Sequence, residues 1–266
     1  MKIIVIGNGF DLNLGLKTSY KDFIESDYFN TLIEENNSLA TYLMAKNNLN
    51  NWVDIEKEIT QYSIDIQYTD ANVKNDFRAL KISLANYLKE AQEGEIDQES
   101  QAFKMIQEEI GTADIIYNFN YTSTVFKVAE LLGIMDIGSK HSYVHGSIEN
   151  MDIIFGVEDK ARIYQNHIFL KKSYNENYGK TDIGKHLKDK HDLVFFGHSL
   201  GITDSSYFAN YIHTLTFDWN MSQLKLYYYR ENGYDEMMTM LDIYTLNNLT
   251  DFKHNNNFSL IDSSKK

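Results

Sequence analysis

Short apolar runs that end at turn-forming or polar residues constrain this 266-residue chain more than any other feature. The first run, Lys2 to Ile6, reads KIIVI and leads directly into a glycine turn. A strand that is apolar at every position is typical of a parallel sheet that is buried on both faces. The other expected strands are Asp114 to Asn118, Ser142 to His145, Asp192 to Phe196, Leu224 to Tyr229 and, more weakly, Ile153 to Phe155. Most of them pass into helical patterns, so we expect an α/β fold with a mainly parallel sheet flanked by helices.

The segments between the strands are expected to be helical or irregular. Apolar residues recur at helical spacing between residues 28 and 111, for example Trp52, Ile55, Ile59 and Tyr62. We expect residues 28–111 to form a large helical insertion or cap on a single domain that spans residues 1–266. Residues 158–190 are expected to form a loop with short helices, and the polar tail from Asp251 is expected to fray.

Composition excludes several classes of protein. The 25 Lys and Arg against 38 Asp and Glu give a net charge of −13, which disfavours binding to nucleic acid or to anionic lipid through a basic face. The absence of cysteine excludes disulfides, thiolate catalysis and cysteine zinc sites. The N-terminal strand does not have the pattern of a signal peptide, and no segment approaches the ~20 apolar residues of a membrane helix. We therefore expect a cytoplasmic protein with neither a membrane nor nucleic acid as partner.

A glycine turn, Gly7-Asn8-Gly9-Phe10-Asp11, follows the first expected strand. Glycines at this place let the backbone approach a pyrophosphate, and the next helix offers N–H groups at its start. The turn lacks the third glycine of G-x-G-x-x-G, and Asp11 would put a negative charge near a phosphate. A tight strand-to-helix turn with Asp11 as the helix cap is therefore an equally weighted alternative.

Two asparagines, Asn118 and Asn120, end the second expected strand. The carboxyl ends of parallel strands line the ligand crevice of an open sheet, where two amides could orient a water molecule or a ribose hydroxyl. The alternative is that one of them caps the helix expected from Thr122 to Leu132.

His145-Gly146-Ser147 ends another expected strand. A histidine there could act as a general base, because its reference pKa of about 6.5 suits proton transfer near neutral pH. The alternative is a structural histidine.

Gly197-His198-Ser199-Leu200-Gly201 matches G-x-S-x-G, the nucleophile turn of α/β-hydrolases. That fold requires an acid and then a histidine after the serine. Only His213 and His254 follow, in an expected helix and in the polar tail, so the hydrolase interpretation is the weaker one.

A metal-dependent phosphoesterase is a further alternative, because carboxylates and imidazoles are suitable metal ligands. The residues that could converge on one edge for this purpose are Asp11, Asn120, His145, His198 and Asp204. No two of them have the spacing of H-x-H or D-x-H, so we predict no metal.

These elements together resemble the AbiH abortive-infection family of bacterial phage-defence proteins. The matching segments are GNGFDLNLGLKTSYKDF at 7–23, NWVDIEKEI at 51–59, NFNYTSTV at 118–125, HGS at 145–147 and GHSLGITDSSYF at 197–208. Members of the family usually carry Glu where this chain has Phe126.

The same elements are more distantly similar to the sirtuin-like NAD-consuming domains of bacterial defence systems. Gly7-Asn8-Gly9 looks like their first loop, and Asn120-Tyr121-Thr122 looks like their Asn-Tyr-Asp element with the acid replaced. His145-Gly146 is similar to their His-Gly. Gly197, Ser199, Leu200 and Asp204 are similar to their G-x-S-L-x-D.

The resemblance implies a Rossmann-like, sirtuin-like sheet and a phage-defence protein whose nucleotide site binds NAD and could hydrolyse it. Asn120 would position the attacking water and the ribose, and His145 would be the base. The implied nucleotide contacts are Gly7, Asn8, Gly9, Phe10, Asp11, Asn118, Gly197, His198, Ser199 and Asp204. A catalytically inactive nucleotide sensor and a phosphoesterase or nuclease are the alternatives. The expected partners are a nucleotide, a phage-derived trigger or partner defence protein, and a second copy of the chain.

Overall fold

The computed structural model describes residues 1–46, 52–65, 72–217 and 222–265. The chain divides into two compact units. The first consists of residues 1–16, 95–144 and 181–266, and the second consists of residues 17–94 and 145–180.

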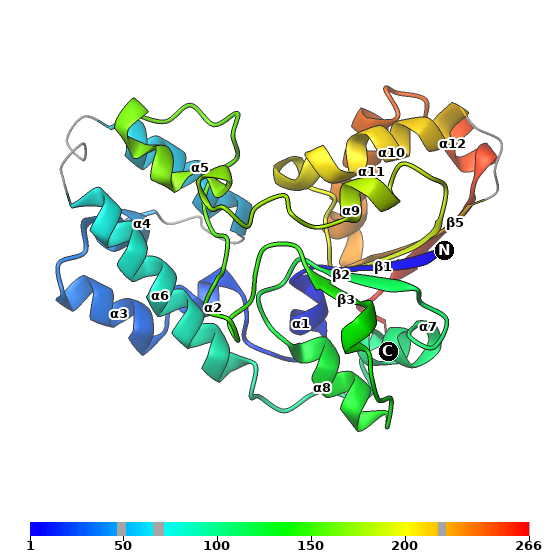
Figure 1. The fold of residues 1–266 in the computed structure, drawn as a ribbon, viewed down its shortest axis with the longest axis horizontal. Coiled ribbons are helices and arrows are strands. Elements are labelled where there is room, and N and C mark those ends of the chain that lie inside the picture. The colour runs from blue at the N-terminus through cyan, green and yellow to red at the C-terminus, as the bar shows by residue number, and fades with distance from the viewer. Residues whose placement is uncertain (47–51, 66–71, 218–221, 266) are drawn as a thin grey trace. The chain divides into compact units, whose positions relative to one another are not determined.

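The first unit contains a six-stranded parallel sheet (Figure 1). The strand order is β3-β2-β1-β4-β5-β6, so β1 is central and pairs with β2 and β4. The strands are β1 Lys2–Ile6, β2 Ile115–Asn118, β3 His141–Tyr143, β4 Asp192–Phe196, β5 Gln223–Tyr228 and β6 Asn257–Asp262. This is the order of the doubly wound dinucleotide-binding folds, whose ligands bind outside the carboxyl ends of the first and fourth strands. The predicted α/β fold with a parallel, Rossmann-like sheet is confirmed.

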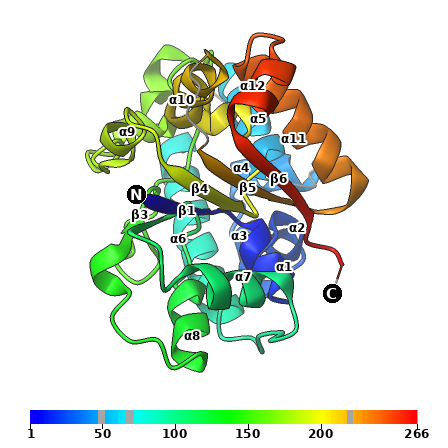
Figure 2. The same ribbon diagram turned by 90° about the vertical axis from the view of Figure 1, so that its right-hand side faces the viewer.

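Helices cover both faces of this sheet, which explains why β1 and β4 are apolar after their first residue. Ile3 and Val5 of β1 lie in one core cluster, and Ile4 and Ile6 lie in a second cluster on the other face. Figure 2 shows α10 and α12 on one side of the sheet and α7 and α8 on the other. The helices of this unit are α1 Gly9–Asn13, α7 Gln101–Glu109, α8 Thr124–Leu131, α9 Ile183–His186, α10 Ser205–Phe217, α11 Arg230–Tyr244 and α12 Leu249–Asn255.

Three expectations about the strands require correction. Residues 153–155 are buried but are not a strand; Phe155 stacks on Phe77 of the second unit at 5.8 Å between ring centroids. The tail from Asp251 does not fray, because it completes α12 and forms the edge strand β6. The third strand ends at Tyr143, so His145 lies beyond it.

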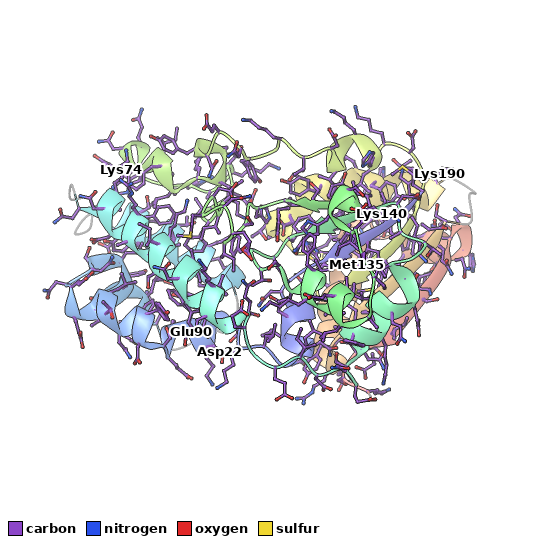
Figure 3. All side chains as sticks on the ribbon, turned by 60° about the horizontal axis from the view of Figure 1, so that its bottom comes forward. Asp22, Lys74, Glu90, Met135, Lys140 and Lys190 are labelled. Carbon is purple, nitrogen blue, oxygen red and sulfur yellow. The ribbon has the colours of Figure 1, made fainter. Side chains whose placement is uncertain are left out.

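The second unit is built mainly from helices with side-chain caps at their starts. Ser19, Ser26 and Asn37 accept backbone N–H bonds at the starts of α2, α3 and α4. Figure 3 shows Asp22 and Glu90 at one end of this unit. The helices are α2 Tyr20–Ile24, α3 Asp27–Glu34, α4 Ser38–Met44, α5 Trp52–Ile64 and α6 Val73–Ala91, followed by 3-10 turns at Gln165–Leu170 and Lys172–Tyr174. Among the described residues, no helix of either unit has both the length and the apolar character needed to cross a bilayer.

Candidate functional site

The loops that follow β1 and β4 pack directly against each other. The backbone N–H of Gly7 donates to the carbonyl of Phe196 at 2.9 Å, and that of Gly9 donates to the carbonyl of Gly197 at 3.0 Å. A Cβ at Gly7 would lie 2.6 Å from the oxygen of Gly197. Gly197 has a φ of +68°, and a Cβ there would lie 2.1 Å from the nitrogen of Phe10. The glycines of both motifs are therefore required where the two loops meet.

Asp11 does not cap a helix, contrary to one of the two alternatives. It is the third residue of α1 and is 0% exposed. Its carboxylate accepts hydrogen bonds from Asn120 Nδ2 at 3.1 Å, Thr122 Oγ1 at 2.6 Å and Thr124 Oγ1 at 2.5 Å. Asp11 thus joins α1 to the turn that follows β2, across more than a hundred residues of sequence.

Burial controls the ionisation of this carboxylate. Loss of solvent raises the pKa of Asp11 to about 6, although the hydrogen bonds from Thr122, Thr124 and Asn120 act in the opposite direction. At neutral pH the group is mainly ionised, with a pKa near the range in which functional acids and bases operate.

We expect the stabilising contribution of Asp11 to decrease as the pH rises. Since its pKa is higher in the folded chain than the ordinary 3.8, the folded state retains a proton that the unfolded state has lost between about pH 4 and pH 6. The free energy of unfolding of the wild type, minus that of Asp11→Asn, should fall by up to about 3 kcal/mol over this interval and stay level above it. Urea unfolding of both proteins from pH 4 to pH 8 measures the difference. A constant difference would contradict the expectation.

Asn118 and Asn120 brace the turn after β2, and neither caps a helix. Asn118 Nδ2 donates to the carbonyl of Thr122 at 3.0 Å, and its Oδ1 accepts from the backbone N–H of Asn120 at 2.9 Å. Helix α8 begins only at Thr124, without a side-chain cap. The predicted asparagine cap is therefore wrong. Because Asn120 Nδ2 donates to the Asp11 carboxylate, Asn120 Oδ1, on the opposite edge of the same planar amide, points away from Asp11.

His198 holds the loop after β4 in place. Its Nδ1 accepts from the backbone N–H of Leu200 at 3.1 Å, so the ring proton is on Nε2, which lies 3.3 Å from Asp204 Oδ2. The ring contacts Phe119 at 4.5 Å between centroids. Both ring nitrogens of His198 are thus directed at groups of its own loop, and its ring joins that loop to the turn after β2.

Ser199 is exposed on the same loop, which is the place where a nucleophile would stand. In the described parts of the chain, no histidine shares a hydrogen bond with its hydroxyl. His213 lies in α10 and packs against Phe217, and His254 lies in α12. The geometry therefore does not favour a serine hydrolase.

We expect a fluorophosphonate probe to leave Ser199 unmodified, because no histidine in the described ranges is hydrogen-bonded to its hydroxyl to remove the proton. Intact-mass spectrometry after incubation measures this, with a known serine hydrolase in the same reaction as positive control. Stoichiometric labelling that disappears in Ser199→Ala would restore the hydrolase interpretation.

His145 belongs to the second unit. It is 6% exposed, its ring lies parallel to that of Tyr178 with centroids 6.3 Å apart, and its carbonyl accepts from the N–H of Ile154 at 2.7 Å. The adjacent Gly146 has a φ of +73°, and a Cβ there would lie 2.3 Å from the carbonyl oxygen of Asp152. The glycine is explained by this turn, and the role of His145 as a base stays a prediction.

A buried ion triad in the second unit was not predicted from the sequence. Lys172 is 4% exposed, and its Nζ lies 2.9 Å from both Glu56 Oε1 and Glu158 Oε1. Glu58 accepts from the hydroxyl of Tyr42 at 3.1 Å. Glu56 and Glu58 belong to the segment 51–59, of which Asn51 lies outside the described residues. These two carboxylates make structural contacts, and the polar segment around Lys172 has no periodicity that would have revealed the triad.

Phe126, which stands where AbiH proteins usually carry Glu, makes an aromatic contact. The ring of Phe126 lies 4.6 Å from that of His141, whose pKa is lowered to about 4 by burial. His141 is therefore neutral, and its half-buried ring packs against the rings of Phe126 and Tyr143. Over the described residues, no group of three or more His, Asp or Glu side chains is arranged to hold a metal ion.

Comparison with protein families identifies the chain. A family model described as Bacteriophage abortive infection AbiH matches residues 3–223. The chain belongs to the AbiH family. This membership gives it a role in bacteriophage abortive infection. The match runs from β1 to the first residue of β5 and includes the turn after β2 and the loop after β4. Among curated proteins and among solved structures, no significant match is found.

Proposed function

We propose that this AbiH chain acts in phage defence by binding NAD at the carboxyl edge of its sheet and hydrolysing the nicotinamide–ribose bond. The observation that carries the proposal is the position of Asp11. In the sirtuin-like pattern an acid occupies the place of Thr122, and here the hydroxyl of Thr122 donates to Asp11. The acid missing from the turn after β2 is thus supplied by α1.

Asn120 is the catalytic residue of this proposal. Its amide is oriented by Asp11, so its Oδ1 can accept a hydrogen bond from a ribose hydroxyl or from the attacking water. The water oxygen bonds to C1′ and releases one proton to the solvent, while the C1′–N bond breaks and its electron pair neutralises the nicotinamide ring. Positive charge develops on the ribose in the transition state, and a buried carboxylate nearby stabilises it.

Further contacts to the nucleotide are proposed on the two loops at this edge. They are the predicted residues that the first unit contributes: Gly7, Asn8, Gly9, Phe10, Asn118, Gly197, His198, Ser199 and Asp204. His145, which the sequence predicts as the base, belongs to the second unit, and its role stays a prediction that is tested separately. A phage-derived trigger, a partner defence protein and a second copy of the chain remain proposed partners.

The decisive experiment is incubation of the pure protein with NAD, with and without phage lysate as trigger, and chromatography of the products. We expect nicotinamide and ADP-ribose. Asn120→Ala should lower the rate by about 10²- to 10⁴-fold, as is usual when a group that positions the reactants is lost, and should abolish phage protection. His145→Ala tests the base in the same way.

Stability must be measured in parallel, because Asn120→Ala also removes one donor from the buried Asp11 carboxylate. We expect this to cost about 1–3 kcal/mol. A folded Asn120→Ala protein that retains full turnover would remove Asn120 from the chemistry.

A nucleotide sensor without catalysis is the second candidate. It is favoured by the complete burial of Asp11 and by its three donors, an arrangement that also suits a purely structural carboxylate. Saturable NAD binding without any nicotinamide release, in the presence of the trigger, would select this candidate.

A further inference from the structure

The glycine turn after β1 can be tested for its fit to a phosphate group. Phosphate-binding turns present several backbone N–H groups to the ligand. Here the N–H groups of Gly7 and Gly9 donate to Phe196 and Gly197, and that of Phe10 donates to the carbonyl of Gly7 at 2.9 Å. Three backbone N–H donors of this turn are thus already hydrogen-bonded within the protein and do not face a ligand.

The presence of glycine gives no separate support for a phosphate. A side chain at Gly7 or Gly9 would collide with the backbone of Gly197, so packing of the two loops already demands glycine at both positions. Helix α1, which follows, has only five residues and hence a weak dipole. A buried carboxylate, Asp11, lies within it.

The distribution of cations points in the same direction. The loops 7–13, 119–124 and 197–204, which follow β1, β2 and β4, contain no Lys or Arg. Lys140 immediately precedes β3 and Lys190 precedes β4, both at the amino ends of strands (Figure 3), and the nearest cation in sequence after a carboxyl end is Arg230, which follows β5. Lys2, at the start of β1, is paired with Glu109. A phosphate at the glycine turn would lie near the Asp11 carboxylate, and these three loops supply no cation to neutralise it.

We propose that the turn Gly7–Asp11 is not a phosphate site, and that this part of the edge takes the ribosyl end of a substrate whose base is cationic, as in an N-ribosylpyridinium. The inference rests on the proposed function and narrows it. The negative field of Asp11 favours the positively charged base, while the phosphates of a dinucleotide must be held elsewhere. Nicotinamide riboside, which carries the cationic base and no phosphate, contains everything that this part of the site recognises.

Titrations of ¹⁵N-labelled protein with two separate probes test the inference. Inorganic pyrophosphate should leave the amide signals of Gly7 and Gly9 unchanged at millimolar concentration. Nicotinamide riboside should shift the side-chain amide signals of Asn120 with saturation. Asp11→Asn should weaken nicotinamide riboside binding at least tenfold, whereas Asp27→Asn, an exposed carboxylate with the same change of charge, should leave it unchanged.

The outcomes separate this inference from the proposed function. Saturable pyrophosphate shifts at Gly7 and Gly9, or absence of any nicotinamide riboside effect at Asn120, would overturn the inference even if NAD is hydrolysed. If nicotinamide riboside binds as expected but NAD is not cleaved, the inference stands and hydrolysis fails. The wild-type titrations decide the matter even if Asp11→Asn does not fold.

Discussion

Replacement of Gly197 by alanine is expected to destabilise the first unit by about 3–5 kcal/mol, enough to leave much of it unfolded at 37 °C. Two effects add together. The left-handed φ of +68° costs an alanine about 1–2 kcal/mol. In addition, the new Cβ would lie 2.1 Å from the nitrogen of Phe10 and 2.5 Å from the carbonyl carbon of Gly9, and neither backbone atom can rotate away.

Gly15→Ala is the matched control. Gly15 also has a positive φ, +89°, but among the described residues nothing beyond its own chain neighbours lies within 4 Å of the position that a Cβ would take there. We expect Gly15→Ala to lower the free energy of unfolding only by the cost of backbone strain, about 1–2 kcal/mol. Urea unfolding followed by circular dichroism measures both variants. Equal losses in the two would show that the contact between the loops after β1 and β4 is not as tight as described.

Lys172→Met is expected to destabilise the second unit by about 3–5 kcal/mol, because it leaves Glu56 and Glu158 close together without their shared cation. The methionine fills much of the same volume, so the loss reports on charge and not on a cavity. The melting temperature of the second unit should fall by several degrees.

An exposed ion pair of the same unit provides the control. Lys21 lies 3.9 Å from Glu25, and both side chains are more than half exposed. Lys21→Met should change the stability by less than about 1 kcal/mol. If Lys172→Met together with Glu158→Gln is no more stable than Lys172→Met alone, repulsion between the carboxylates is not the cause of the loss.

The central strands could be predicted closely from the sequence because burial on both faces leaves a distinct pattern. KIIVI and DLVFF are apolar after their first residue, and β1 and β4 have the predicted bounds. The edge strand β6 could not be predicted this way. Its sequence NFSLID is half-exposed along most of its length, so it looks like the polar tail around it.

An apolar run reports burial and not strand pairing, which explains the error at residues 153–155. Their burial is real, but it is satisfied by aromatic packing with Phe77 and not by a neighbouring strand. No periodicity distinguishes these two situations in three residues.

The candidate site was predicted in part. The pattern of strand ends predicted that Gly7, Asn120, His145 and Gly197 lie along one edge, since parallel strands end on the same side. Gly7, Asn120 and Gly197 do follow β1, β2 and β4, whereas His145 lies beyond the end of β3 and belongs to the second unit. The link between Asp11 and the turn after β2 could not be predicted, because it joins residues 109 to 113 positions apart through side chains alone. A buried carboxylate gives no local signal of where its donors are.

The central position of β1 has a consequence for how the protein is made. Ile3 pairs with Ile115 on one side and with Leu193 on the other. The first strand therefore cannot pair until β2 and β4 have been synthesised. At about 5–20 residues per second, the roughly 190 positions between Ile3 and Leu193 take roughly 10–40 s to emerge from the ribosome. During that time the aliphatic segment IIVI has no strand to pair with. The helices that follow it in the sequence depend on contacts of short sequence separation and form early. The nascent chain therefore exposes an apolar segment that can aggregate, and its yield in a bacterial cell should depend on chaperones that bind such segments.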